Sequence, residues 1–180
     1  MRARLKRPAQ AVAVAGVTAL GALLIWNLTH QTPPPKVGAP APAFSLRRLI
    51  GSGELSLASF RGKTVVLNFF ASWCDPCKRE APALEKVWKE YRGRGVVVLG
   101  IDSGDAASDA RHFLAVHGIT YPVAFDHDES QALKYGIPGL PVTFVINPAG
   151  RVVGGEIVGP VTDHPYAQTF KRDLDAAIKA

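Results

Sequence analysis

The two cysteines of this chain lie close together, in the stretch Ala71-Ser72-Trp73-Cys74-Asp75-Pro76-Cys77-Lys78-Arg79-Glu80. They are the only cysteines in the 180-residue sequence. Two thiols at this spacing can form a structural crosslink, half of a metal site or a reversible redox pair. On a helix, side chains at positions i and i+3 lie roughly 5–6 Å apart. This separation allows a disulfide with little backbone movement.

The elements around the cysteines favour redox chemistry. Thr64–Phe70 is a nearly continuous apolar, β-branched run, which predicts a buried central strand. A helix is predicted over residues 75–91, with Pro76 in its first turn. Cys74 is then expected to be exposed at the helix tip, where free N–H groups and the helix dipole lower the pKa of a thiol. Cys77 is expected to point inward and to resolve a mixed disulfide formed on Cys74.

The structural crosslink and the metal site are weaker interpretations. A disulfide that closes so short a loop removes little entropy from the unfolded chain. A zinc site needs four ligands, and this motif supplies two. The five histidines show no zinc-finger spacing to the pair; they are His30, His112, His117, His127 and His164. His112 and His117 are five positions apart on a predicted helix, so they are not expected to share a face. We therefore predict no metal.

The rest of the chain alternates between strand and helix patterns. Further strands are predicted at residues 54–57, 96–101, 121–125, 142–146 and 151–158, and further helices at 108–117, 130–135 and 164–178. Asn147-Pro148-Ala149-Gly150 is typical of a hairpin turn between the last two strands. This order predicts an α/β sandwich around a mixed central sheet.

The N-terminal part has a different composition. Arg2, Arg4, Lys6 and Arg7 precede an uncharged, apolar run from Ala9 to Leu28, and no acidic residue occurs before Glu54. About twenty apolar residues in a helix span a bilayer, and the basic cluster predicts a cytoplasmic N-terminus. We predict a cytoplasmic tail at residues 1–8, a transmembrane anchor at 9–28, a Pro-rich linker at 29–41 and a folded domain at 42–180. A cleaved signal peptide is the alternative to the anchor.

The charge distribution argues against nucleic acid as a partner. The formal net charge of the chain is +6, with 21 basic and 15 acidic residues. Four of the basic residues belong to the tail, so the rest of the chain is nearly balanced. A basic patch on a folded face is the usual electrostatic footprint of a nucleic-acid-binding protein. We therefore predict no nucleic-acid binding.

Two segments together resemble thioredoxin-fold proteins, specifically the membrane-anchored TlpA/ResA/CcmG (DsbE-like) thiol–disulfide oxidoreductases. The first runs from Val65 through the two cysteines to Pro82, and the second is Gly136-Ile137-Pro138-Gly139-Leu140-Pro141-Val142-Thr143-Phe144-Val145-Ile146. The resemblance implies a thioredoxin-like three-layer sandwich from Pro42 to the C-terminus, behind an N-terminal transmembrane helix. It also implies a cis Leu140–Pro141 bond facing the disulfide, with Leu140 able to pair with a substrate chain.

The resemblance assigns roles to two further residues. Glu80 matches an acidic residue near the active site of this subgroup, where it could adjust the thiol pKa values or relay a proton from Cys77. The alternative is a first-turn glutamate that complements the helix dipole. Asn68 stands where cytosolic thioredoxins carry a buried aspartate, so any proton role at that place passes to Glu80 or water. Trp73 is expected to offer a flat apolar surface to a docking partner.

The direction of electron flow follows from the residues between the cysteines. Asp75 would repel a thiolate and Pro76 adds no charge, whereas strong oxidants of the DsbA type place a histidine here. We therefore predict a reductant, without cofactor and monomeric, on the extracytoplasmic face of a bacterial cell membrane. The resemblance implies apocytochrome c as the client during cytochrome c biogenesis, and a membrane electron donor of the CcdA or DsbD type. General extracytoplasmic disulfide exchange, in either direction, is the alternative.

Two activities from other classes fit the motifs poorly. A peroxiredoxin-like peroxidase needs a threonine three residues before its reactive cysteine, and Ala71 occupies that place. A copper-delivery module of the Sco type needs one more residue between its two cysteines. Both are kept as weaker alternatives.

Overall fold

The structure is a computed structural model that describes residues 6–29 and 32–180. The chain divides into two compact units, residues 1–32 and 33–180. Each unit is described by itself.

The described residues of the first unit form the helix α1 (Lys6–Thr29), which covers the predicted anchor at residues 9–28. Its side chains are described for residues 10–26. Within the described part of the chain, no helix meets the length and apolarity required of a membrane span. Two parts of the predicted organisation lie outside the described residues. They are residues 1–5, which make up most of the basic tail, and His30 and Gln31 of the linker.

The second unit is built on a five-stranded mixed sheet in the order β5-β4-β3-β6-β7. The strands are β3 (Thr64–Phe70), β4 (Val96–Ser103), β5 (Val123–Asp126), β6 (Val142–Ile146) and β7 (Val152–Val158). β3 is parallel to β4 and antiparallel to β6. β4 is also parallel to β5, and β6 is antiparallel to β7. Every residue of β3 is buried, as its continuous apolar sequence predicts for a central strand.

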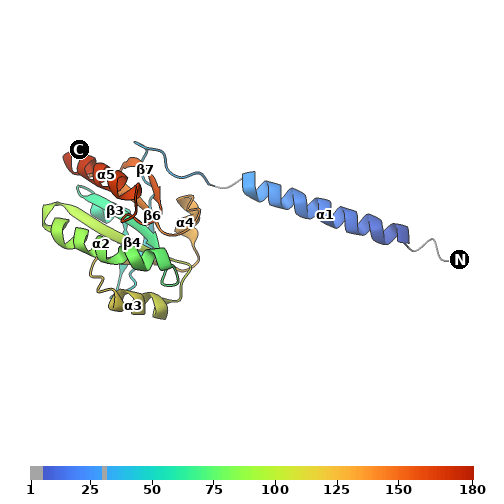
Figure 1. Ribbon diagram of the computed structural model, residues 1–180, viewed down its shortest axis with the longest axis horizontal. Helices are drawn as coiled ribbons and strands as arrows, with labels where there is room; N and C mark the ends of the chain where they lie inside the picture. The colour runs from blue at the N-terminus through green and yellow to red at the C-terminus, as the bar shows by residue number, and fades with distance from the viewer. Residues whose placement is uncertain (1–5, 30–31) are drawn as a thin grey trace. The chain divides into compact units, whose positions relative to one another are not determined.

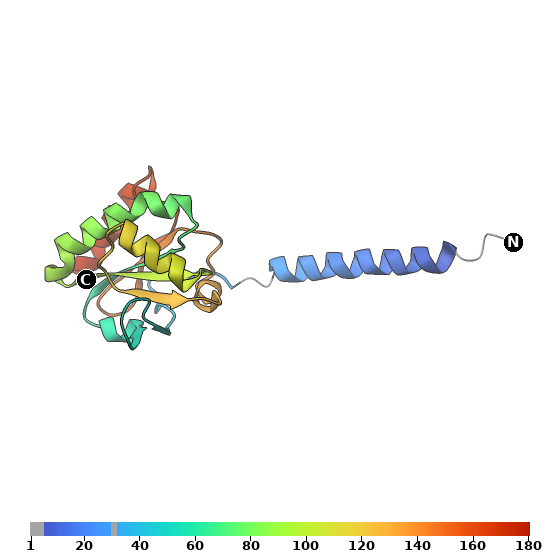
Figure 2. The ribbon, with the colours of Figure 1, turned by 90° about the horizontal axis from the view of Figure 1, so that it is seen from below.

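Helices cover both faces of this sheet (Figure 1). One apolar cluster joins the sheet to α2 (Asp75–Tyr91), α3 (Ala107–Val116) and α5 (Tyr166–Lys179). The other cluster includes residues of α4 (Ser130–Lys134) and of the 3-10 helix η1 (Leu57–Phe60). Figure 2 shows α2 in green on one side of the strands and η1 in teal on the other. Side chains of β3 alternate between the clusters, with Val66 and Phe70 in the first and Leu67 and Phe69 in the second.

The predicted thioredoxin-like arrangement is confirmed, and most predicted boundaries hold within two residues. The residues around the predicted linker contain features that the sequence pattern did not reveal. β1 (Ser45–Arg47) and β2 (Glu54–Ser56) form a separate two-stranded antiparallel sheet, of which only the second strand was predicted. Gly38 and Ala41, in the predicted linker, donate backbone hydrogen bonds to Val152 and Gly150. Residues 38–41 therefore pair with the edge of the folded unit.

Candidate active site

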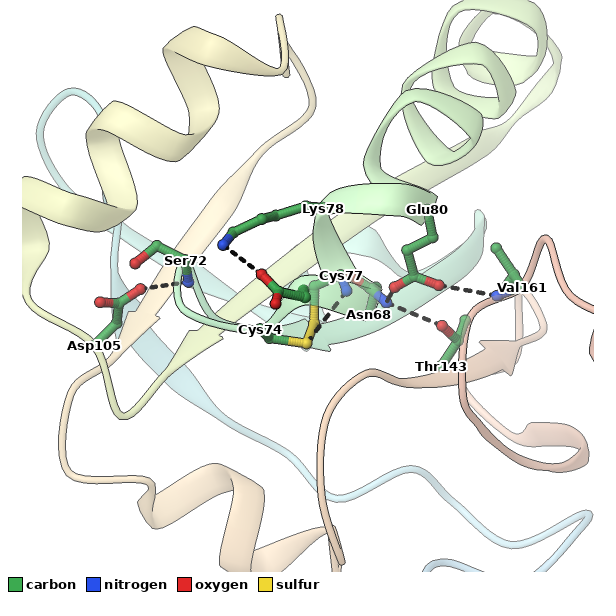
Figure 3. Close-up of a disulfide and its surroundings, with 10 residues drawn as sticks. Asn68, Ser72, Cys74, Cys77, Lys78, Glu80, Asp105, Thr143 and Val161 are labelled. Carbon is green, nitrogen blue, oxygen red and sulfur yellow. Dashed lines mark hydrogen bonds and ion pairs between the residues drawn. A yellow bond between two sulfur atoms is a disulfide. The ribbon is translucent and has the colours of Figure 1, made fainter.

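The cysteine pair lies where β3 ends and α2 begins. Cys74 is the N-cap residue of α2, and its Sγ accepts a hydrogen bond from the backbone N of Cys77 at 3.2 Å. The two residues form a disulfide with a Cα–Cα distance of 5.3 Å (Figure 3). Pro76 occupies the first turn of the helix, as predicted. Because the free N–H groups of a helix start favour negative charge, this position suits a cysteine that reacts as a thiolate.

One expectation about this pair is wrong. Cys74 was expected to be exposed, but only 4% of the residue is accessible, compared with 1% for Cys77. The physical reason is that both cysteines belong to a buried apolar cluster between the sheet and its helices. Leu140, in the loop before β6, packs against this cluster. A helix tip that would be open on an isolated helix is therefore buried in the folded protein.

The loop before β6 contains the predicted cis bond, Leu140–Pro141. Pro141 is buried and Leu140 is half-buried. A second cis bond, His164–Pro165, was not predicted. Trp73 is 60% exposed and its Nε1 donates a hydrogen bond to the Gly104 carbonyl at 3.2 Å. The apolar ring therefore faces solvent while its polar atom is held by the protein.

A small groove of about 180 Å³ separates Trp73 from the cis-proline loop. It combines apolar residues of that loop with polar groups from β4 and from the turn before α4. The lining residues are Trp73, Ser103, Glu129, Ala132, Ile137, Pro138, Gly139 and Leu140. A groove of this size admits a side chain of a docked polypeptide and leaves little room for a larger ligand.

Glu80 is buried, with 1% of the residue exposed. Its Oε1 accepts a hydrogen bond from Asn68 Nδ2 at 2.8 Å, and its Oε2 accepts one from the Val161 backbone N at 2.9 Å (Figure 3). Burial raises the pKa of Glu80 to about 7; the hydrogen bonds from Val161 and Asn68 oppose this rise, and the charge of Asp163 adds to it. A glutamate that only complements the helix dipole would remain solvated, so this alternative does not fit.

Asn68 supports Glu80 from the neighbouring strand. Besides its bond to Glu80, Asn68 Nδ2 donates a hydrogen bond to Thr143 Oγ1 at 3.0 Å. Thr143 lies on β6, directly opposite Asn68 in the antiparallel pairing of β3 and β6. Thr143 and Val161 were not recognised in the sequence, because a threonine in a strand and a backbone amide carry no distinctive pattern. Only the antiparallel pairing of β3 with β6 brings Thr143 to Asn68.

Asp75 differs from Glu80 in being exposed. It forms an ion pair with Lys78 at 2.7 Å. The hydrogen bond from Lys78 and the charge of Lys78 hold the pKa of Asp75 below its usual value. The repulsion that was predicted between Asp75 and a Cys74 thiolate is therefore weakened by the neighbouring cation and by solvent.

The described histidines are not gathered around the cysteines as metal ligands. Among the residues that the structure describes, no group of three or more His, Cys, Asp or Glu side chains could hold a metal ion. His112 lies on α3, and both His112 and His117 line one groove beside Ser72. His117 is the C-cap residue of α3, where the helix ends.

The fold and the disulfide define a class of protein: a thioredoxin-fold thiol–disulfide oxidoreductase. Residues 37–154 match the model of the AhpC/TSA family. The thiol–disulfide oxidoreductase ResA of Bacillus subtilis (strain 168) is 34% identical over 137 residues, which cover 74% of this chain and 75% of that protein. The chain belongs to the AhpC/TSA family and is related within it to the ResA oxidoreductases.

Solved structures agree with this assignment. A Chlorobium tepidum protein assigned as the thiol:disulfide interchange protein DsbE matches with a TM-score of 0.72 and 30% identity, over 80% of this chain and 99% of that one. A thioredoxin-family thiol:disulfide interchange protein from Chlorobium tepidum TLS has a TM-score of 0.65 and 35% identity, over 77% of this chain and 95% of that one. The predicted family resemblance is confirmed.

Proposed function

We propose that this protein is a membrane-anchored reductant of protein disulfides, with Cys74 as the attacking thiol and Cys77 as the resolving thiol. The observation that carries the proposal is the position of the disulfide. Cys74 caps α2, Leu140 of the cis-proline loop packs against the apolar cluster that contains both cysteines, and the buried carboxyl group of Glu80 follows one turn after Cys77. This combination supplies a nucleophile, a surface for a substrate chain and a proton carrier.

The exchange begins from the reduced protein. The Cys74 thiolate attacks one sulfur of the client disulfide, which forms a mixed disulfide and releases one client thiolate. The Cys77 thiolate then attacks Cys74 Sγ, which restores the Cys74–Cys77 disulfide and releases the second client thiol. Two electrons pass to the client. A membrane donor of the CcdA or DsbD type returns the protein to the dithiol form by the reverse exchange.

Glu80 is the proposed proton carrier for Cys77. The two residues are three positions apart on α2, so their side chains lie on the same face of the helix. A general base works best when its pKa lies near the operating pH, and burial raises the pKa of Glu80 to about 7. Glu80 can accept the Cys77 proton before Cys77 attacks, and Asn68 holds its carboxyl group in place.

The predicted anchor supports an extracytoplasmic location. The apolar sequence from Ala9 to Leu28 follows a basic N-terminus, and basic residues favour the cytoplasmic side. We propose tail, anchor, linker and domain at residues 1–8, 9–28, 29–41 and 42–180, with the monomeric redox domain on the periplasmic side of a bacterial cell membrane. A disulfide reductase on that side would act where client disulfides form.

The proposed client is apocytochrome c, whose haem-binding cysteines must be reduced before haem is attached. This proposal rests on the resemblance to the TlpA/ResA/CcmG proteins. General disulfide exchange with extracytoplasmic proteins is the second candidate, because the groove beside Trp73 holds few groups that would select one sequence. The two candidates predict different trapped proteins.

Trapping by Cys77→Ala in the native host tests the proposal. Without the resolving thiol, the mixed disulfide on Cys74 accumulates and can be recovered under non-reducing conditions. We expect an apocytochrome c under growth that requires cytochrome c, and no adduct with the matched Cys74→Ala, Cys77→Ala control. Several unrelated partners would favour general disulfide exchange. Complete absence of Cys74 adducts would contradict the assignment of the attacking thiol.

A further inference from the structure

The turn after β4 holds the two residues that precede Cys74. Asp105 Oδ2 accepts a hydrogen bond from the Ser72 backbone N at 2.6 Å (Figure 3). The Gly104 carbonyl accepts the Trp73 indole N–H at 3.2 Å. Because its polar atom is bound, the Trp73 ring keeps a fixed place although most of the residue is exposed. The ring therefore forms a rigid wall of the groove of about 180 Å³ beside the cis-proline loop.

Glu129 contributes a carboxyl group to the lining of this groove. The backbone N of Glu129 and the backbone N of Gly104 both donate hydrogen bonds to the Asp126 carbonyl, each at 3.1 Å. The carboxyl group of Glu129 lies against Gly104, because a Cβ at that position would collide with Glu129 Oε1. The glycine at position 104, with a φ of 64°, therefore allows a carboxylate to lie directly against the turn that holds Trp73.

The backbone around Glu129 is held in place by the buried side chain of Asp126. The Asp126 carboxyl group accepts hydrogen bonds from Ser130 Oγ and from the backbone N atoms of residues 131 and 132, at 3.2, 3.1 and 3.0 Å. Glu129 itself has a φ of 57°, in the left-handed region that residues other than glycine seldom adopt. A carboxylate on so constrained a backbone is preorganised to meet a charge at one place.

The negative charge of Glu129 has no partner in the described part of the chain. The residue is exposed, and no lysine, arginine or histidine within residues 6–29 and 32–180 forms an ion pair with it. Asp75, the exposed carboxylate between the two cysteines, is by contrast paired with Lys78. The wall of the groove therefore presents a negative charge that the folded protein leaves uncompensated.

We propose that this groove receives the side chain of an arginine or lysine next to the reacting cysteine of the client, and that Glu129 selects it. The proposal rests on the proposed function and names the class of client sequence. The apolar side chains of Ile137, Pro138 and Leu140 cover the methylene stem, while Glu129 binds the cationic end. The exposed ring of Trp73 adds a cation–π contact. An acidic side chain in the same place would be repelled by Glu129.

The position of the groove determines which client residue it receives. Trp73 directly precedes Cys74, and Leu140 packs against the apolar cluster that contains both cysteines. Consecutive Cα atoms of a chain are roughly 3.8 Å apart, so a client cysteine that reaches Cys74 brings its neighbouring side chain to the groove. A single carboxylate favours a class of side chain and does not specify one sequence.

The test is the reduction of symmetric peptide disulfides by the reduced full-length protein in detergent. In each peptide an arginine, a glutamine or a glutamate adjoins the single cysteine, before it in one series and after it in the other. Each reaction passes two electrons from the Cys74–Cys77 dithiol to the peptide disulfide and releases two peptide thiols, which are separated by chromatography after an acid quench. In at least one series we expect the second-order rate constant of the arginine peptide to exceed that of the glutamine peptide about fivefold and that of the glutamate peptide about tenfold.

Substitutions at the exposed carboxylates assign the preference. Glu129→Gln should remove the advantage of the arginine peptide, and Glu129→Lys should reverse it in favour of the glutamate peptide. Asp128→Asn is the matched control, because Asp128 is an exposed neighbour that does not line the groove, and it should keep the preference. Salt at about 1 M should reduce the preference in the wild type. Hydroxyethyl disulfide, which is small and uncharged, should be reduced equally well by the wild type and Glu129→Gln.

The proposal is overturned by equal rate constants for the three peptides in both series. It is also overturned if the arginine preference survives in Glu129→Gln or disappears in Asp128→Asn. These outcomes leave the proposed function intact, because the peptides and hydroxyethyl disulfide are still reduced. Failure of the dithiol protein to reduce any of these disulfides would instead contradict the proposed reductant, and this proposal with it.

Discussion

Glu80 on α2 and Asp102 on β4 are both buried carboxyl groups, and they differ in what their oxygens contact. Glu80 accepts one N–H group on each oxygen, from Asn68 and from Val161. Asp102 accepts none from the described residues. Burial raises the pKa of both groups, to about 7 for Glu80 and about 8 for Asp102. The same physical cause, burial, therefore acts on one carboxyl group that has N–H donors and on one that has none.

The largest expected difference is in the free energy of unfolding when each carboxyl group is truncated to alanine. Glu80→Ala leaves two buried N–H donors without acceptors, and each such donor costs roughly 1–3 kcal/mol. We expect the free energy of unfolding to fall by about 3 kcal/mol. Asp102→Ala leaves no N–H donor unsatisfied and should cost about 1 kcal/mol or less. Urea unfolding of the oxidised protein measures both.

Glu90→Ala is the matched control for this pair of variants. Glu90 lies on α2 like Glu80 but is exposed, and an exposed substitution of this kind is expected to change the unfolding free energy by about 0.5 kcal/mol or less. Equal losses for Glu80→Ala and Asp102→Ala would show that the two carboxyl groups are not distinguished by their donors.

The pH dependence of stability provides the next largest effect. Each group keeps its proton in the folded protein at a pH where the unfolded chain has already lost it, so stability falls as pH rises. For Glu80 the fall ends near pH 7, and for Asp102 near pH 8. Between pH 7 and 8 the unfolding free energy should drop by up to about 1.4 kcal/mol, chiefly through Asp102.

Two conservative variants separate the contributions. Asp102→Asn should remove the fall between pH 7 and 8, whereas Glu80→Gln should remove only the part that ends near pH 7. Denaturant unfolding at a series of pH values checks both. A wild-type stability that rises across pH 7 to 8, or a fall that neither substitution affects, would contradict the protonation states assigned here.

The smallest effect is expected at the exposed carboxylate, Asp75. Its charge is paired with Lys78 and screened by solvent. Asp75→Asn should lower the pKa of the reduced Cys74 thiol by about half a unit or less. Lys78→Ala, which leaves Asp75 unpaired, should raise it by a similar amount. The pH dependence of alkylation by iodoacetamide measures the thiol, and a change of several units would mean that Asp75 dominates the site.

The sequence predicted the elements of the site more accurately than their contacts. The β3 and α2 boundaries agree with the prediction at Thr64–Phe70 and Asp75–Tyr91, because a continuous apolar run and an amphipathic repeat are local patterns. The cis Leu140–Pro141 bond followed from family resemblance. The strand at Ser45–Arg47 was missed, since its three residues carry no alternation long enough to recognise.

What the sequence determined by itself was the chemistry available: two cysteines at helical spacing, a capped helix start and a strand that must be buried. Local residue order is sufficient for those conclusions, because they depend on propensity and periodicity. Only the tertiary structure decided that Cys74 is covered, that Glu80 loses solvent and that Asp105 reaches Ser72. These outcomes depend on residues distant in sequence being packed together, and burial strengthens charge interactions only after that packing has excluded water.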